Sequence, residues 1–163
     1  MKVTIFTSCY NQAPYIKDCI ESVLCQTHTD FEYLLIDDGS TDNTKDIIKE
    51  YSKRDKRIKP IFLSKYPNIG SVLNLSISIM KGDYWVWVPS DDLILPSLVE
   101  KKLKISDDNT IILGCGDKID KDSKFLGAIK FFWDNNSDFI NRVWNDCFIG
   151  MTGVMIPYAL FNR

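Results

Sequence analysis

Short apolar segments alternate with amphipathic helical patterns along the N-terminal part of the chain, and this alternation constrains the fold more than any other feature. Strands are expected over residues 3–7, 33–36, 58–63 and 84–88, which are rich in apolar, β-branched and aromatic side chains. Helical spacing of apolar residues follows each of the first three segments. Strands that alternate with helices pair in parallel through right-handed crossovers. The sequence therefore predicts an α/β fold, a mostly parallel sheet flanked by helices.

The remaining part of the chain is less regular. Expected here are a helix from Pro96 to about residue 104, strands over 110–115, 125–133 and 148–156, and a short helix over 137–144. There is no internal repeat and no low-complexity linker, and 163 residues suit one domain.

Composition and charge exclude several classes of protein. Apolar residues make up 45% of the chain and charged ones 26%, which is ordinary for a globular domain. The formal charge of -2 leaves no basic excess for a phosphate backbone, so no nucleic-acid partner is expected. No apolar run reaches the roughly 18 to 20 residues of a transmembrane helix, and no signal-peptide pattern is present. A cytoplasmic protein is expected, with peripheral membrane attachment and a homo-oligomer left open.

The cysteines and the single histidine carry little functional signal. The five cysteines are scattered, and no two form a C-x-x-C pair, so buried free thiols are expected rather than disulfides or a zinc site. His28 lies in a polar turn and is expected to be a loop residue. Trp85 and Trp87 alternate on one predicted strand, so both are expected to pack against the same layer of helices.

Two adjacent carboxylates, Asp91 and Asp92, follow the nearly continuously apolar segment 84–88. Neighbouring carboxylates repel each other and lose hydration, so the pair is costly unless a cation or hydrogen-bond donors compensate. Their hard oxygens suit Mg²⁺ or Mn²⁺, which commonly bridge protein carboxylates to substrate phosphates. The alternative is a solvated turn before the helix that begins near Pro96.

A similar pair, Asp37 and Asp38, follows the second predicted strand. A carboxylate at this place can accept hydrogen bonds from a nucleotide base or ribose. The alternative is a loop whose polar residues, over 40–42, cap the next helix. Ligands of open parallel sheets bind at the carboxyl ends of the strands, so all these polar clusters are expected along one rim.

Taken together, five separated motifs resemble family 2 of the GT-A glycosyltransferases. They are Thr7-Ser8-Cys9-Tyr10-Asn11, Asp37-Asp38-Gly39-Ser40-Thr41-Asp42, Asn68-Ile69-Gly70 with Asn74, Lys81-Gly82-Asp83-Tyr84, and Ser90-Asp91-Asp92 with Pro96. The resemblance implies a Rossmann-like GT-A nucleotide-sugar-binding sheet. It also implies a UDP-sugar or similar donor and a Mn²⁺ or Mg²⁺ cofactor.

The resemblance also implies roles for individual residues. Ser8 and Tyr10 match positions that contact the nucleotide base, and Asp38 matches one that hydrogen-bonds it. Asp91 and Asp92 match the carboxylates that bind the metal and the ribose, so Asp91 is a candidate for both nucleotide and metal binding.

Two departures from the family pattern affect the expected site. Members often have Asp-x-Asp-Asp where this chain has Pro89-Ser90-Asp91-Asp92, so the leading carboxylate is missing. In relatives the catalytic base is an Asp in an acidic motif beyond a segment that resembles residues 150–157, and this chain stops at Arg163. Asp134, Asp138 and Asp146 lie too early to match that base. The catalytic residue is therefore unassigned, and residues 1–163 are expected to be one GT-A domain truncated at its acceptor and catalytic-base end.

The implied activity is transfer of a sugar, with inversion, from the nucleotide donor to a hydroxyl of a carbohydrate or glycan-lipid acceptor. The cation would neutralise the charge on the departing diphosphate. Two alternatives stay open: a nucleotide-sugar-binding module without turnover, and a nucleotidyltransferase. Against the latter, residues 8–12 contain no glycine, whereas such enzymes have a glycine-rich first loop.

Overall fold

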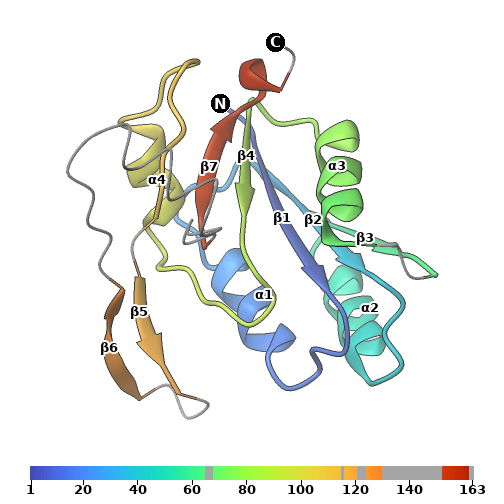
Figure 1. Cartoon of the computed structure of the whole chain (residues 1–163). Helices are drawn as coiled ribbons and strands as arrows, with labels where there is room; N and C mark the ends of the chain where they lie inside the picture. Colours follow the sequence, from blue (N-terminus) through green and yellow to red (C-terminus); the bar gives the residue numbers. More distant parts are fainter. Residues whose placement is uncertain (65–67, 115, 121–123, 130–151, 162–163) are drawn as a thin grey trace.

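The computed structural model is an α/β domain built on a five-stranded sheet with strand order β3-β2-β1-β4-β7 (Figure 1). It describes residues 1–64, 68–114, 116–120, 124–129 and 152–161. The strands are β1 (Val3–Cys9), β2 (Phe31–Asp37), β3 (Ile58–Phe62), β4 (Tyr84–Trp87) and β7 (Val154–Pro157). The first four are parallel, and β7 pairs with β4 in the antiparallel sense. The mostly parallel sheet predicted from the sequence is confirmed.

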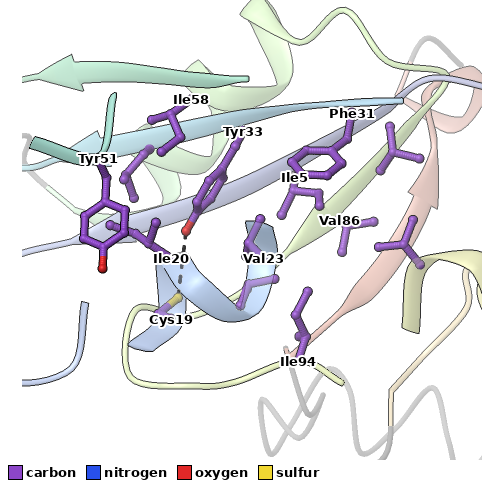
Figure 2. Close-up of a cluster of buried hydrophobic side chains, with 14 of the residues drawn as sticks. Ile5, Cys19, Ile20, Val23, Phe31, Tyr33, Tyr51, Ile58, Val86 and Ile94 are labelled. Atoms are coloured by element: carbon purple, nitrogen blue, oxygen red, sulfur yellow. Dashed lines mark hydrogen bonds between the residues drawn. The ribbon is translucent and has the colours of Figure 1, made fainter. Parts of the chain in front are cut away.

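Helices cover both faces of this sheet. They are α1 (Ile16–Leu24), α2 (Thr44–Arg54), α3 (Ile69–Ile79) and α4 (Leu98–Leu103). Buried side chains of α1, α2 and α4 pack with one face of β1, β2 and β4, and Figure 2 shows part of this cluster. Side chains of α3 pack on the opposite face, beside Phe6 and Trp85. The sheet is therefore the middle layer of the domain.

Strand β4 is apolar along its whole length because both of its faces are covered. Trp85 and Trp87 lie on the α3 face, with ring centroids 6.2 Å apart, and the Phe6 ring stacks on Trp85 at 5.6 Å. The prediction that both tryptophans face one layer is confirmed. The Trp85 indole Nε1 donates to Ser76 Oγ of α3 at 3.0 Å, so its buried N–H group has an acceptor.

The sequence-based prediction of a strand over 110–115 is wrong. Among the described residues 110–114, only Ile112 makes a β-bridge with another described residue, Met155 of β7. The preceding residues form a turn, because Asp107 accepts hydrogen bonds from the Asn109 amide at 2.7 Å and the Thr110 hydroxyl at 2.9 Å. Apolar residues 111–113 contribute one bridge rather than a ladder.

The other C-terminal predictions are partly tested. Strand β6 (Phe125–Ile129) covers the start of the expected strand 125–133 and pairs with β5 (Gly116–Ile119). Strand β7 covers the end of the expected strand 148–156, and residues 148–151 of that segment lie outside the described residues. The expected helix over 137–144 lies outside the described residues. Helix α4 begins at Leu98, two residues after the predicted start at Pro96.

Of the cysteines, Cys9 and Cys19 are buried free thiols, as expected. Cys25 is exposed, which corrects the sequence-based expectation. It is the C-cap residue of α1, and the buried residues of this helix end at Val23. Cys115 and Cys147 lie outside the described residues. No helix in the described ranges is both long and apolar enough to cross a bilayer.

Candidate functional site

The carboxyl ends of β1, β2 and β4 meet at one edge of the sheet, and the predicted site residues lie there. Cys9, the last residue of β1, is in register with Asp37, the last of β2, and the Asp38 amide donates to the Cys9 carbonyl at 2.9 Å. The Val88 amide, just after β4, donates to the Phe6 carbonyl of β1 at 2.9 Å. Ser8 and Tyr10, Asp38, and Asp91 with Asp92 therefore belong to one edge, while their roles in binding stay predictions.

The loop after β1 is tied to the loop after β2 through Asn11. The Asn11 backbone has φ 53°, in the left-handed region, which asparagine tolerates better than most residues. Its side-chain Oδ1 accepts from the Thr41 amide at 2.8 Å and from the Thr41 hydroxyl at 3.3 Å. Its own amide donates to Ser40 Oγ at 2.9 Å. These bonds fix the loop that carries Tyr10 next to the loop that carries Asp38.

A second pair of bonds links the same loops at the start of α2. The Gln12 amide donates to Thr44 Oγ1 at 2.8 Å, and the Ala13 amide donates to Asp42 Oδ2 at 3.1 Å. Asp42 Oδ1 also accepts from the Thr44 amide at 3.0 Å, and hydrogen bonding to Thr44 holds the pKa of Asp42 below its ordinary value. Asp42 thus serves the start of α2, which is the capping role that the sequence left open for residues 40–42.

The two carboxylates of the first acidic pair lie in different environments. Asp37 is 1% exposed, and its Oδ1 accepts from the Ser40 amide at 3.3 Å and from the Cys9 thiol at 3.9 Å. Burial raises the pKa of the Cys9 thiol, so this thiol stays protonated and can donate. Asp38 is only half-buried. Asp37 therefore supports the loop, and Asp38 is the more exposed carboxylate of the pair.

The second acidic pair lies in a turn just beyond β4. The Asp92 amide donates to the Pro89 carbonyl at 3.2 Å, which closes the turn. Asp91 is exposed, whereas Asp92 is half-buried and accepts a hydrogen bond at Oδ2 from the Thr152 hydroxyl. Burial raises the pKa of the Asp92 carboxyl, the Thr152 hydrogen bond opposes this rise, and the charge of Asp91 adds to it. The ionised form of Asp92 is therefore disfavoured, and a cation would stabilise it.

The donor set of this pair can be compared with the needs of particular metals. Across the described residues, no group of three or more His, Cys, Asp or Glu side chains could hold an ion. A closed zinc site is therefore not formed by them. Mg²⁺ and Mn²⁺ are commonly bound by one or two carboxylates, with water and substrate phosphate as the other ligands. Asp91 and Asp92 fit an ion of this second kind.

Sequence reasoning missed two contacts at this edge. Asn11 belongs to the first motif, but its bonds to Thr41, 30 residues away, were not expected. Thr152 lies 60 residues from Asp92 and was given no role. The preference of asparagine for positive φ is a signal for Asn11, although a weak one, and we find no comparable signal for Thr152.

The family model described as "Glycosyl transferase family 2" matches residues 4–163. The chain belongs to glycosyltransferase family 2. An uncharacterized glycosyltransferase of Rickettsia bellii (strain RML369-C) is 36% identical over 168 residues, a match that covers 99% of this chain and 23% of that protein. The family 2 chain thus spans about a quarter of the length of this relative.

Two solved structures show the same fold. S. aureus TarS 1-349, in complex with UDP-GlcNAc, matches with a TM-score of 0.57 and 27% identity over 64% of this chain and 30% of that one. The mannosyltransferase PcManGT from Pyrobaculum calidifontis, in complex with GDP-Man and Mn²⁺, matches with a TM-score of 0.65 over 71% of this chain and 35% of that one. Its 19% identity supports the fold alone. The GT-A fold expected from the sequence is confirmed.

Proposed function

We propose that this family 2 chain binds a UDP-sugar at the carboxyl edge of its sheet and transfers the sugar to a hydroxyl of a carbohydrate or glycan-lipid acceptor. The observation that carries the proposal is the meeting of Asp38 and the Asp91–Asp92 pair at one edge, in a chain of this family. UDP is favoured as the nucleotide because the related TarS has been solved with UDP and with UDP-GlcNAc.

In this proposal the loops after β1 and β2 hold the nucleoside. The half-buried Asp38 carboxylate accepts hydrogen bonds from N–H groups of the base. Tyr10 is 42% exposed, so its ring is accessible for stacking on the base. Ser8 is half-buried at the end of β1, and its hydroxyl adds a second polar contact. The Asn11 bonds pre-organise these groups before the donor arrives.

Asp91 and Asp92 would hold Mn²⁺ or Mg²⁺ together with the diphosphate of the donor. The bound cation would neutralise negative charge that develops on the diphosphate as it leaves. The chain's own contribution is to hold the two carboxylates at the carboxyl end of β4, where burial disfavours the ionised form of Asp92. The Thr152 hydroxyl assists by donating to Asp92 Oδ2.

Calorimetry of UDP binding tests this proposal. We expect wild-type chain to bind UDP about tenfold more tightly or better with Mn²⁺ than with a chelator, because carboxylates and diphosphate share the ion. Asp92→Asn should remove most of this gain. Asp83→Asn is the matched control, since Asp83 is a carboxylate at the opposite end of β4, where it accepts from the Lys2 amide at 2.9 Å.

Equal UDP affinity with Mn²⁺ and with chelator would overturn the metal role. An equal loss in Asp83→Asn would show that the effect is one of general charge rather than of this site. Release of UDP from UDP-sugars, measured with and without carbohydrate acceptors, then tests the transfer reaction itself.

A further inference from the structure

Beneath the proposed metal site, a buried chain of hydrogen bonds connects β2, β1 and the end of β4. The Tyr33 hydroxyl donates to Thr7 Oγ1 at 3.0 Å, and Thr7 Oγ1 donates to the Val88 carbonyl at 2.7 Å. All three residues are 0% exposed. Each hydroxyl has one proton, and the Thr7 proton goes to the Val88 carbonyl, so Tyr33 is the donor in its bond with Thr7. The direction of this series of hydrogen bonds is therefore fixed, and the series ends at the Val88 carbonyl, just after β4.

Cys19 of α1 reaches the next carbonyl along the same turn. Its thiol donates to the Pro89 carbonyl at 3.4 Å, and the same oxygen accepts the Asp92 amide at 3.2 Å. The thiol also lies 3.9 Å from the Tyr33 hydroxyl, the contact drawn as a dashed line in Figure 2, and 4.0 Å from Thr7 Oγ1. Burial raises the pKa of Cys19 to about 12, so the thiol keeps its proton. Side chains from the core thus donate hydrogen bonds to two consecutive backbone carbonyls, those of Val88 and Pro89.

The Val88 carbonyl requires such a donor because it lies beyond the end of the strand. The last residue of β4 is Trp87, and the parallel ladder between β1 and β4 ends there. A carbonyl in the buried interior without a donor would cost the full desolvation of that group. A buried hydroxyl without a hydrogen-bond partner also costs free energy. Valine has nearly the same shape as threonine but no hydroxyl, so it would fill the position of Thr7 without this cost. The hydroxyls of Thr7 and Tyr33 are therefore matched to the Val88 carbonyl.

We infer that Thr7 and Tyr33 are positioning residues for the Asp91–Asp92 pair, acting through the backbone of the turn that begins at Val88. This inference rests on the proposed function, since it concerns the same metal and diphosphate. By fixing the Val88 carbonyl, the two hydroxyls set where the turn leaves the sheet, and so where both carboxylates lie before the donor binds. A purely structural network would change the stability of the fold but not the metal-dependent part of donor binding.

The test compares Thr7→Val with Thr7→Ser and with a control on the same strand. Thr7→Val keeps the shape and removes the donor, whereas Thr7→Ser restores the hydroxyl. Thr4→Val is the control, because Thr4 is also a 0% exposed threonine of β1 and its hydroxyl donates to Glu32 at 2.7 Å, near the other end of the strand. UDP affinity is measured with Mn²⁺ and with chelator, well below the unfolding temperature of each variant.

We expect Thr7→Val to lose most of the gain in UDP affinity that Mn²⁺ gives, because a displaced Asp91–Asp92 pair binds the shared ion less well. The affinity in chelator should be unchanged. Thr7→Ser should recover the gain, and Thr4→Val should keep it. A Thr7→Val chain with the wild-type gain would overturn the inference.

Hydrogen exchange provides a readout that needs no donor. The Asp92 amide is protected by the Pro89 carbonyl, so Thr7→Val should make this amide exchange faster while Thr4→Val should not. If Thr7→Val does not fold, Tyr33→Phe removes only the outer donor and is measured in the same way. Unchanged exchange at Asp92 would overturn the positioning role. If wild-type chain shows no gain with Mn²⁺, the proposed function fails, and exchange alone then decides the positioning role.

Discussion

Replacing Asn11 tests whether the two nucleoside-side loops are held together as described. Asn11 contributes in two separable ways: its Oδ1 accepts two hydrogen bonds from Thr41, and its backbone has φ 53°. Asn11→Asp keeps an acceptor at the same place and a residue that tolerates positive φ. Asn11→Gly removes the acceptor but suits the backbone. Asn11→Ala loses on both counts.

The expected costs follow from these two contributions. Loss of the hydrogen bonds at this exposed site should cost about 1 kcal/mol of unfolding free energy. Left-handed backbone costs an ordinary L-residue about 1 kcal/mol more. We therefore expect about 2 kcal/mol for Asn11→Ala, about 1 kcal/mol for Asn11→Gly, and less than about 0.5 kcal/mol for Asn11→Asp. If the loop must be reordered when UDP binds, 1 kcal/mol corresponds to a roughly fivefold weaker affinity.

Urea unfolding gives the stability of each variant, and calorimetry gives the affinity for UDP. We predict that Asn11→Asp is the most stable of the three variants, followed by Asn11→Gly and then Asn11→Ala. If Asn11→Gly were as destabilised as Asn11→Ala, the positive φ would not contribute. If all three variants matched wild-type chain in both assays, the link between the loops would have no role in the site.

Three further substitutions test the site and the core. The raised pKa of Asp92 means that folding favours its protonated form, so this contribution to stability is present below its ordinary pKa of 3.8 and is lost as pH rises through the folded value. Asp92→Asn should therefore be more stable than wild-type chain at pH 7, and urea unfolding should show this difference shrinking toward pH 3.8; a constant difference would contradict it. Gly82→Ala places a Cβ 2.4 Å from the Thr4 backbone nitrogen and should cost roughly 2–4 kcal/mol, so an unchanged Tm would refute this contact. Ser76→Ala removes the acceptor of the Trp85 indole and should cost about 1–3 kcal/mol in urea unfolding, unlike an exposed serine.

The parallel core could be predicted from the sequence because its physical signature is local. Strand β4 reads as a continuous apolar run, since both faces of a central parallel strand are buried. The apolar residues 111–113 have the same local appearance, yet within the part of the chain that the structure describes they make only the bridge at Ile112. Whether such a segment pairs along its length depends on neighbours far away in the chain, and periodicity does not contain this information.

The site was predictable at the level of residue types and strand ends, but not of contacts. The sequence gives Asp37 and Asp38 the same chemistry, and only the fold shows that Asp37 is the buried one. The Thr152 bond to Asp92 spans 60 residues. The Tyr33 bond to Thr7 spans 26 residues and lies in an apolar core, where both residues resemble ordinary strand formers.

The central claim is that a divalent cation and UDP bind together at Asp91 and Asp92, and the location of bound Mn²⁺ tests it most directly. Paramagnetic Mn²⁺ broadens the NMR signals of nearby amides, so it can be located in solution without a crystal. With UDP present, the strongest broadening is predicted at residues 90–93 and at Thr152, whose hydroxyl contacts Asp92. The amide of Asp83, at the opposite end of β4, should be affected much less. Broadening centred away from residues 90–93, or the same pattern and strength without UDP, would contradict the account.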